Sequence, residues 1–148
     1  MRIRALLIVA AATAVTAGCG NGEPANPVTQ VTSATPAEAG AAGPDLSAEE
    51  FEDETGKDAV AVIAQDNRFV APYIEVSAGT KVDFTNKGRN QHDVVPTTDG
   101  AFAEIPPEDF QPKDEGSITF TVPGDYAYYC SLHGTKDKGM IGAVRVLQ

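Results

Sequence analysis

Short alternating apolar stretches, cut apart by glycine and proline, constrain the fold of this chain more than any other feature. Apolar and polar residues alternate within these stretches, as in strands that bury one face of a sheet. The 14 Gly and 10 Pro interrupt the chain too often for long helices. We therefore expect an all-β domain, a sandwich or barrel, over residues 57–148. The strands predicted within it are 60–63, 82–85, 118–122, 126–130 and 142–147.

The net charge excludes one class of partner. The chain carries 11 Lys+Arg against 21 Asp+Glu, a formal net charge of -10 at pH 7. Nucleic-acid binding requires a basic face that displaces counterions, so we expect no nucleic-acid partner. No apolar run reaches the roughly 20 residues that a helix needs to cross a bilayer. We expect the domain to be a monomer.

The first 18 residues have the features of an export signal. Arg2 and Arg4 form a basic head, an apolar run covers 5–15, and small residues lead to Cys19. This arrangement resembles a bacterial lipobox, although Thr16 stands where Leu is usual. The resemblance implies a lipoprotein lipidated at Cys19 and anchored to the cell membrane, facing outside the cytoplasm, in the periplasm or at the cell surface. The alternative is plain secretory cleavage, which leaves Cys19 as a free thiol or a disulfide partner for Cys130.

Two segments connect this signal to the domain. Residues 19–44 are rich in Pro, Ala and Thr and nearly free of large apolar residues, which predicts a flexible tether. An acidic short helix is predicted over 45–56. Ser47 and Glu50 match a capping box, and Leu46 and Phe51 have the spacing of a hydrophobic staple.

Four metal-binding side chains stand out near the C-terminus. Cys130, His133 and Met140 fall within eleven positions, in a predicted loop between two strands, and His92 lies upstream. Two imidazoles, one thiolate and a weak thioether match the ligand set of blue-copper centres. Apart from Met1 and Cys19, these are all the His, Cys and Met residues of the chain. A zinc site is the chemical alternative, although structural zinc usually takes four strong ligands.

Several motifs together resemble a cupredoxin of the plastocyanin and azurin superfamily. They cover most of residues 59–147 in the family's order: Asp-Asn-Arg-Phe at 66–69, Ile-Glu-Val-Ser-Ala-Gly-Thr-Lys-Val at 74–82, Phe-Thr-Asn at 84–86 and Pro-Gly-Asp-Tyr at 123–126. The resemblance implies a Greek-key β-sandwich with one mononuclear type 1 copper. It also implies that His92, Cys130 and His133 are the equatorial ligands and Met140 the axial one.

The resemblance also assigns roles around the metal. His133 would be the electron port, with Leu132 in the surrounding apolar patch. Tyr129 would pack under the site or lie near a second electron path, unless it is simply a core residue. The family often has Asn where this chain has Asp93, and that Asn ties the two ligand loops together. We expect Asp93 to accept hydrogen bonds from Ser131 or a nearby backbone N–H.

The spacing between the last two ligands departs from the family pattern. Six residues separate His133 from Met140, more than is usual in plastocyanin-like chains, and the extra residues are 135–138.

The function expected from this resemblance is one-electron transfer between Cu(II) and Cu(I), with redox proteins as partners. The alternatives are a copper-binding or copper-delivery protein without an electron-transfer role, and an interaction domain that kept the fold. We do not expect an enzyme. Multicopper oxidases and copper nitrite reductases need more histidines for their catalytic copper than the two present here.

Overall fold

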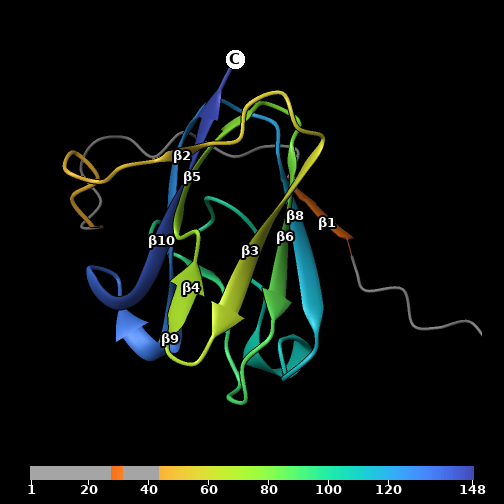
Figure 1. The fold of residues 1–148 in the computed structure, drawn as a ribbon, viewed down its shortest axis with the longest axis vertical. Coiled ribbons are helices and arrows are strands. Elements are labelled where there is room, and N and C mark those ends of the chain that lie inside the picture. The colour runs from red at the N-terminus through yellow and green to blue at the C-terminus, as the bar shows by residue number, and fades with distance from the viewer. Residues whose placement is uncertain (1–27, 32–43) are drawn as a thin grey trace, which may run out of the picture.

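The computed structural model describes residues 28–31 and 44–148, which form two facing five-stranded sheets (Figure 1). One sheet has the order β1-β8-β6-β3-β4 and the other β2-β5-β10-β9-β7. The strands are β1 (Val28–Val31), β2 (Glu52–Asp53), β3 (Ala59–Gln65), β4 (Arg68–Val70), β5 (Tyr73–Ser77), β6 (Lys81–Asn86), β7 (Val95–Pro96), β8 (Glu115–Phe120), β9 (Gly124–Thr135) and β10 (Lys138–Leu147). A short 3-10 helix, η1, covers Pro107–Asp109. The expected all-β class is confirmed.

The core lies between the two sheets and follows the alternation in the sequence. Along β3, β6 and β8 every second side chain is buried. Aromatic side chains fill the centre, where the Tyr128 ring meets Phe69 and Phe84 edge-on at 5.0 and 5.3 Å between centroids. Such edge-to-face pairs add to the free energy gained by burying the rings. The predicted strands therefore face the core as the pattern indicated.

Neighbouring strands come from distant parts of the chain. β3 pairs in parallel with β6, and β5 pairs in parallel with β10, so the chain crosses between the two sheets. At one crossing, between β8 and β9, the Tyr126 hydroxyl donates a hydrogen bond to the Val122 carbonyl at 2.8 Å. A tyrosine bonded back to the preceding loop fixes such a corner in other sandwiches. The crossings allow β10 to pair with β5 and β9 to pair with β7, both of which lie upstream in the chain.

The helix predicted over 45–56 is wrong, because the described residues 44–56 contain no helix. The side chain of Asp45 accepts a hydrogen bond from Ser47 N at 3.0 Å and forms a turn, and β2 then pairs in parallel with β5. Phe51 packs 5.8 Å from Tyr73 and lies under the Arg145 guanidinium at 3.9 Å. Sheet pairing and these ring contacts outweigh a local helical preference of a few tenths of a kcal/mol per residue.

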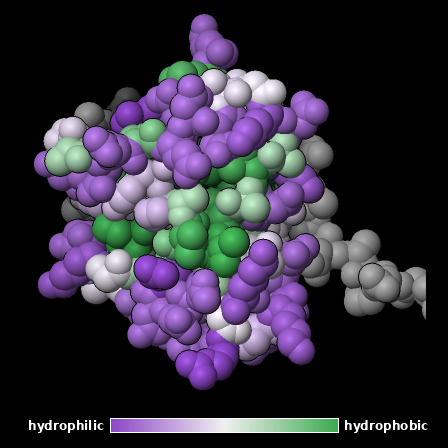
Figure 2. All heavy atoms as spheres, viewed as in Figure 1, coloured by the Kyte–Doolittle hydropathy of each residue, from purple (hydrophilic) through white to green (hydrophobic). Residues whose placement is uncertain are grey.

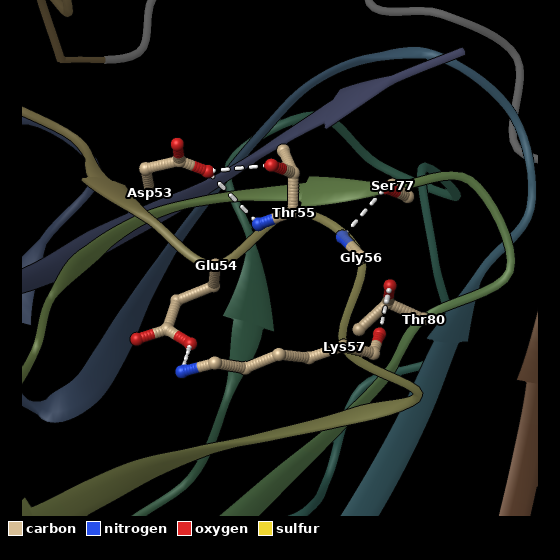
Figure 3. Close-up of polar contacts among 7 residues, drawn as sticks. All are labelled: Asp53, Glu54, Thr55, Gly56, Lys57, Ser77 and Thr80. Carbon is tan, nitrogen blue, oxygen red and sulfur yellow. Dashed lines mark hydrogen bonds and ion pairs between the residues drawn. The ribbon is translucent and has the colours of Figure 1, made fainter.

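A small polar network ties the segment after β2 to the turn between β5 and β6 (Figure 3). Gly56 N donates to Ser77 Oγ at 3.1 Å, and the Thr80 hydroxyl donates to the Lys57 carbonyl at 2.9 Å. Lys57 also forms an ion pair with Glu54. The acidic segment is therefore fixed to the end of the sandwich that carries the C-terminus (Figure 1).

Part of the predicted tether joins a sheet. Val28–Val31 forms β1, which pairs in parallel with β8. Val and Thr favour extended backbone, and the outer edge of β8 offers unpaired backbone groups. The predicted signal peptide, Cys19 and most of the tether lie outside the described residues. Among the described residues, no helix is long and apolar enough to cross a membrane.

Gly142 of β10 is a sharp test of this packing. A Cβ at this position would lie 2.5 Å from the Pro72 carbonyl oxygen and 2.5 Å from the Tyr128 ring, both held in place by the sheets. We expect Gly142→Ala to lower the free energy of unfolding by about 2–3 kcal/mol, measured by chemical denaturation. Gly116→Ala is the control, because the nearest atoms to its Cβ would belong to the side chain of Ile105 and not to backbone. Equal losses in both variants would contradict the rigid approach at Gly142.

Candidate metal centre

The pairing of β9 with β10 contains a bulge that carries three of the four predicted ligands. Gly139 pairs with Gly134 and Ile141 pairs with Tyr129, so Met140 alone faces the four residues 130–133. A bulge of this kind redirects side chains that a regular ladder would hold apart. Cys130 and Met140 are fully buried, whereas His133 is half-buried.

The loop expected between His133 and Met140 is instead a continuation of both strands. Thr135 pairs with Lys138 across a two-residue turn, and the Thr135 hydroxyl donates to Asp137 at 2.6 Å. Gly139 has φ +89°, and a Cβ there would lie 2.8 Å from the His133 carbonyl oxygen. The extra residues 135–138 therefore project as a hairpin tip and leave Met140 opposite the other ligands.

His92 reaches the same place from a different part of the chain, in a loop held by a buried asparagine. Asn86, at the end of β6, donates its amide to the carbonyls of Asn90 (2.9 Å) and Phe110 (3.0 Å) and accepts from Gly88 N (3.0 Å). The backbone N–H of His92 also donates to the Phe110 carbonyl at 3.3 Å. Asn86 was noted in the sequence only as part of a motif. Its burial and its three hydrogen bonds give it the role of fixing this loop.

The three strongest donors converge. Cys130 Sγ lies 3.7 Å from Nδ1 of His92 and 3.4 Å from Nδ1 of His133, and the two imidazole rings are 4.8 Å apart. One ligand atom from each residue lies within 4.8 Å of the others. A sulfur at about 2.3 Å and a nitrogen at about 2.1 Å from one ion, roughly 120° apart, would be separated by about 3.8 Å. The donor set and its spacing therefore fit one metal ion.

Burial favours the neutral forms of two of these donors, His92 and Cys130. It lowers the pKa of His92, and the neighbouring His133 lowers it further. Burial raises the pKa of the Cys130 thiol to about 11, and the Asp93 side chain adds to that rise, while backbone hydrogen bonds from Asp93 and Leu132 work against it. A thiolate forms only when something compensates its charge, so a metal ion that binds here displaces the thiol proton.

Asp93 joins the His92 loop to the Cys130 strand, and the expected hydrogen bond to Ser131 is confirmed. Its Oδ1 accepts from Ser131 N at 2.7 Å, and its Oδ2 accepts from the Ser131 hydroxyl. Asp93 itself is only 1 % exposed. Both carboxylate oxygens act as acceptors, so the side chain spans the two segments that carry the metal-binding residues.

The remaining predicted residues lie at or near the surface. Leu132 is 49 % exposed beside the half-buried His133, the arrangement expected of an apolar contact patch. Tyr129 is half-buried and points to the outer side of β9, whereas its neighbours Tyr128 and Cys130 point into the core. The reading of Tyr129 as a core residue is therefore wrong.

Comparison with known proteins agrees with this site. A family model described as copper-binding proteins of the plastocyanin/azurin family matches residues 57–147. The plastocyanin of Solanum crispum is 33% identical over 87 residues, which cover 53% of this chain and 86% of that protein. The chain spans about half the length of several other curated plastocyanins that it matches, 46% to 52%.

Solved structures show the same fold. Amicyanin from Paracoccus versutus has a TM-score of 0.52 and 26% identity, over 61% of this chain and 82% of that one. A copper-containing nitrite reductase from Thermus scotoductus SA-01 has a TM-score of 0.51 and 28% identity. That match covers 60% of this chain but only 22% of the reductase, so it corresponds to one part of a larger protein.

The Asp93–Ser131 link can be tested in the metal-free protein. Asp93→Ala removes two hydrogen bonds to a charged acceptor and should lower the free energy of unfolding by about 2–3 kcal/mol. Ser131→Ala removes only the hydroxyl bond and should cost about 1.5 kcal/mol. Because the two residues act through one link, the double variant should lose less than the sum of the single losses. Additive losses in chemical denaturation would show that the residues do not cooperate.

Proposed function

Because the chain belongs to the plastocyanin/azurin family of copper-binding proteins, we propose that it is a one-electron carrier whose single type 1 copper is held by His92, Cys130, His133 and Met140. The observation that carries this proposal is the convergence of two imidazole nitrogens on one buried sulfur, at 3.7 and 3.4 Å.

Each side chain contributes a different property. Copper supplies the chemistry, a reversible one-electron change between Cu(I) and Cu(II). The Cys130 thiolate is a soft donor that favours Cu(I), the two imidazoles suit both states, and the thioether of Met140 is a weak fourth donor. Cys130 and His133 are fixed by β9, Met140 by β10, and His92 by the loop that Asn86 holds. A rigid protein frame keeps ligand rearrangement small when the electron moves.

The residues available favour a carrier over an enzyme. The chain has two histidines, and both lie in this one cluster. A second, catalytic copper built on several histidines cannot form from this chain alone. Electrons would enter and leave through the half-buried His133, with exposed Leu132 contacting the partner. The partners would be redox proteins.

We further propose that the carrier is exported and tethered by a lipid on Cys19. The basic head, the apolar run and the small residues before Cys19 support this. The segment that follows the tether is attached to the end of the sandwich that carries the C-terminus, opposite the hairpin of β9 and β10 (Figure 1). The lipid itself would be attached upstream of β1, so it would reach the sandwich through Val28, the residue of β1 that pairs with Ser117 of β8.

The decisive test of the metal centre is to add Cu(II) to the purified domain and record visible absorption and electron paramagnetic resonance. We expect an intense thiolate-to-copper absorption that Cys130→Ser abolishes. Met140→Leu should retain the absorption in shifted form and change the reduction potential, because the thioether is the weakest donor. No absorption in the wild type would overturn the proposal. Copper binding with negligible electron self-exchange would favour copper delivery instead.

The negative charge of Asp93 should set the reduction potential low. A buried carboxylate stabilises the more positive Cu(II) state, and Asn in its place removes the charge while keeping the side-chain shape. At an effective dielectric constant of about 20, one charge several ångströms away contributes on the order of 2 kcal/mol, which is on the order of 100 mV for one electron. Asp93→Asn should therefore raise the potential in voltammetry. Asp125→Asn, on an exposed part of β9, is the control and should shift it far less.

A further inference from the structure

Four segments meet around the metal centre at one end of the sandwich, and we call them together the site end. They are residues 65–68, 86–92, 106–114 and 133–139. The Asn90 amide donates to Asn67 at 3.3 Å, His92 N donates to the Phe110 carbonyl, and the His92 and His133 rings are 4.8 Å apart. These contacts join all four segments. The site end lies opposite the C-terminus (Figure 1), and the face of it that Figure 2 shows is largely hydrophilic.

The charge of the protein is divided unequally between this end and the rest. The site end contains six Lys or Arg and five Asp or Glu, and the buried Asp93 follows it directly, so its net charge is close to zero. The remaining described residues contain three Lys or Arg and fourteen Asp or Glu. The chain is therefore strongly acidic, but the end that carries His133 is not. The basic residues of the site end are Arg68, Lys87, Arg89, Lys113, Lys136 and Lys138, all exposed.

Ion pairing increases this contrast. Away from the site end, each of the three basic residues, Lys57, Lys81 and Arg145, is paired with a carboxylate. At the site end only Lys136 makes such a pair, at 3.4 Å with Asp99, whose side chain is 98% exposed. Within the described ranges the other five basic residues make no ion pair. Their charges are available to a partner.

We propose that the site end is a docking surface for a redox protein whose own electron-transfer site is surrounded by acidic residues. This inference rests on the proposed function, because it takes His133 as the electron port. Exposed Leu132 would form the apolar centre of the contact, and the unpaired Lys and Arg side chains its basic rim. The same partner would repel the acidic remainder of the chain. This repulsion would orient the protein with its site end toward the partner.

Charge complementarity of this kind acts mainly on the rate and orientation of encounter. The Debye length is about 10 Å at 0.1 M ionic strength, so a partner at the site end responds chiefly to charges within that distance. The net charge of the whole chain is then largely screened. A partner chosen by net charge would be basic, whereas a partner chosen by the site end would be acidic, and the two alternatives make opposite predictions.

Small oxidants of opposite charge distinguish these alternatives. The Cu(I)-loaded protein gives one electron to hexacyanoferrate(III), which becomes hexacyanoferrate(II), or to tris(phenanthroline)cobalt(III), which becomes the cobalt(II) complex. At 0.1 M ionic strength we expect Arg89→Glu with Lys138→Glu to slow the reaction with the anion at least about threefold and to speed that with the cation. Lys57→Glu with Lys81→Glu makes the same change in net charge at the other end and should alter both rates less than about 1.5-fold.

Potentials are measured for every variant, so that driving force is separated from docking. If both double variants slow the reaction with the anion equally, net charge alone steers the encounter and the proposal is overturned. The proposal is also overturned if neither double variant changes the rate. Gln replaces Glu at all four positions if a Glu variant fails to fold.

A second measurement does not need copper. In the metal-free protein, redox-inert hexacyanochromate(III) should broaden amide resonances of residues 88–90 and 134–138 and leave those near Lys57 and Lys81 sharp. Broadening of 88–90 and 134–138 in a protein that does not bind copper would refute the proposed function but still support a docking surface for acidic groups. Equal broadening of amide resonances over the whole protein would overturn the proposed docking surface. Vesicles with 30% phosphatidylglycerol test whether the surface binds a membrane instead. If the wild type binds them at 0.1 M salt and the Arg89→Glu, Lys138→Glu variant does not, the surface binds lipid and the proposal is overturned.

Discussion

The register shift between β9 and β10 is the constraint on which the rest of this structure depends. By setting Met140 alone against residues 130–133, it turns Cys130 and His133 toward one point without breaking either strand. Regular pairing would place these side chains along a ladder, with alternate residues on opposite faces. The hairpin tip at 135–138 and the close approach at Gly139 follow from this shift, because the chain must reverse just beyond the bulge.

The fourth residue arrives from another part of the chain, and buried polar groups set its position. Asn86 fixes the loop that presents His92, and Asp93 bonds that loop to Ser131 on β9. A half-satisfied polar group in such a place would be costly, whereas these side chains use most of their hydrogen-bonding capacity. The same bonds that stabilise the fold therefore hold the donors in one arrangement, which suits a centre that changes charge without changing shape.

The arrangement of charge separates two tasks within one small domain. The acidic segment around β2 and the C-terminal end of the sandwich keep the chain strongly negative, which favours solubility. The site end carries most of the unpaired basic side chains around the half-buried His133. A net charge taken from composition conceals this division, because it sums over both ends.

The sequence by itself determined the strand pattern, the family and the identity of the four donors, because each depends on residue type and spacing along the chain. It also indicated that Asp93 would bond to Ser131. It misjudged 45–56, where local capping signals favoured a helix but β2 pairs with β5 and Phe51 packs against Tyr73. It gave no sign that Val28–Val31 would pair with β8. Only the tertiary structure decided the bulge, the role of Asn86 and the gathering of unpaired basic side chains at the site end. These depend on which segments meet in space, and long-range pairing, not local preference, brings them together.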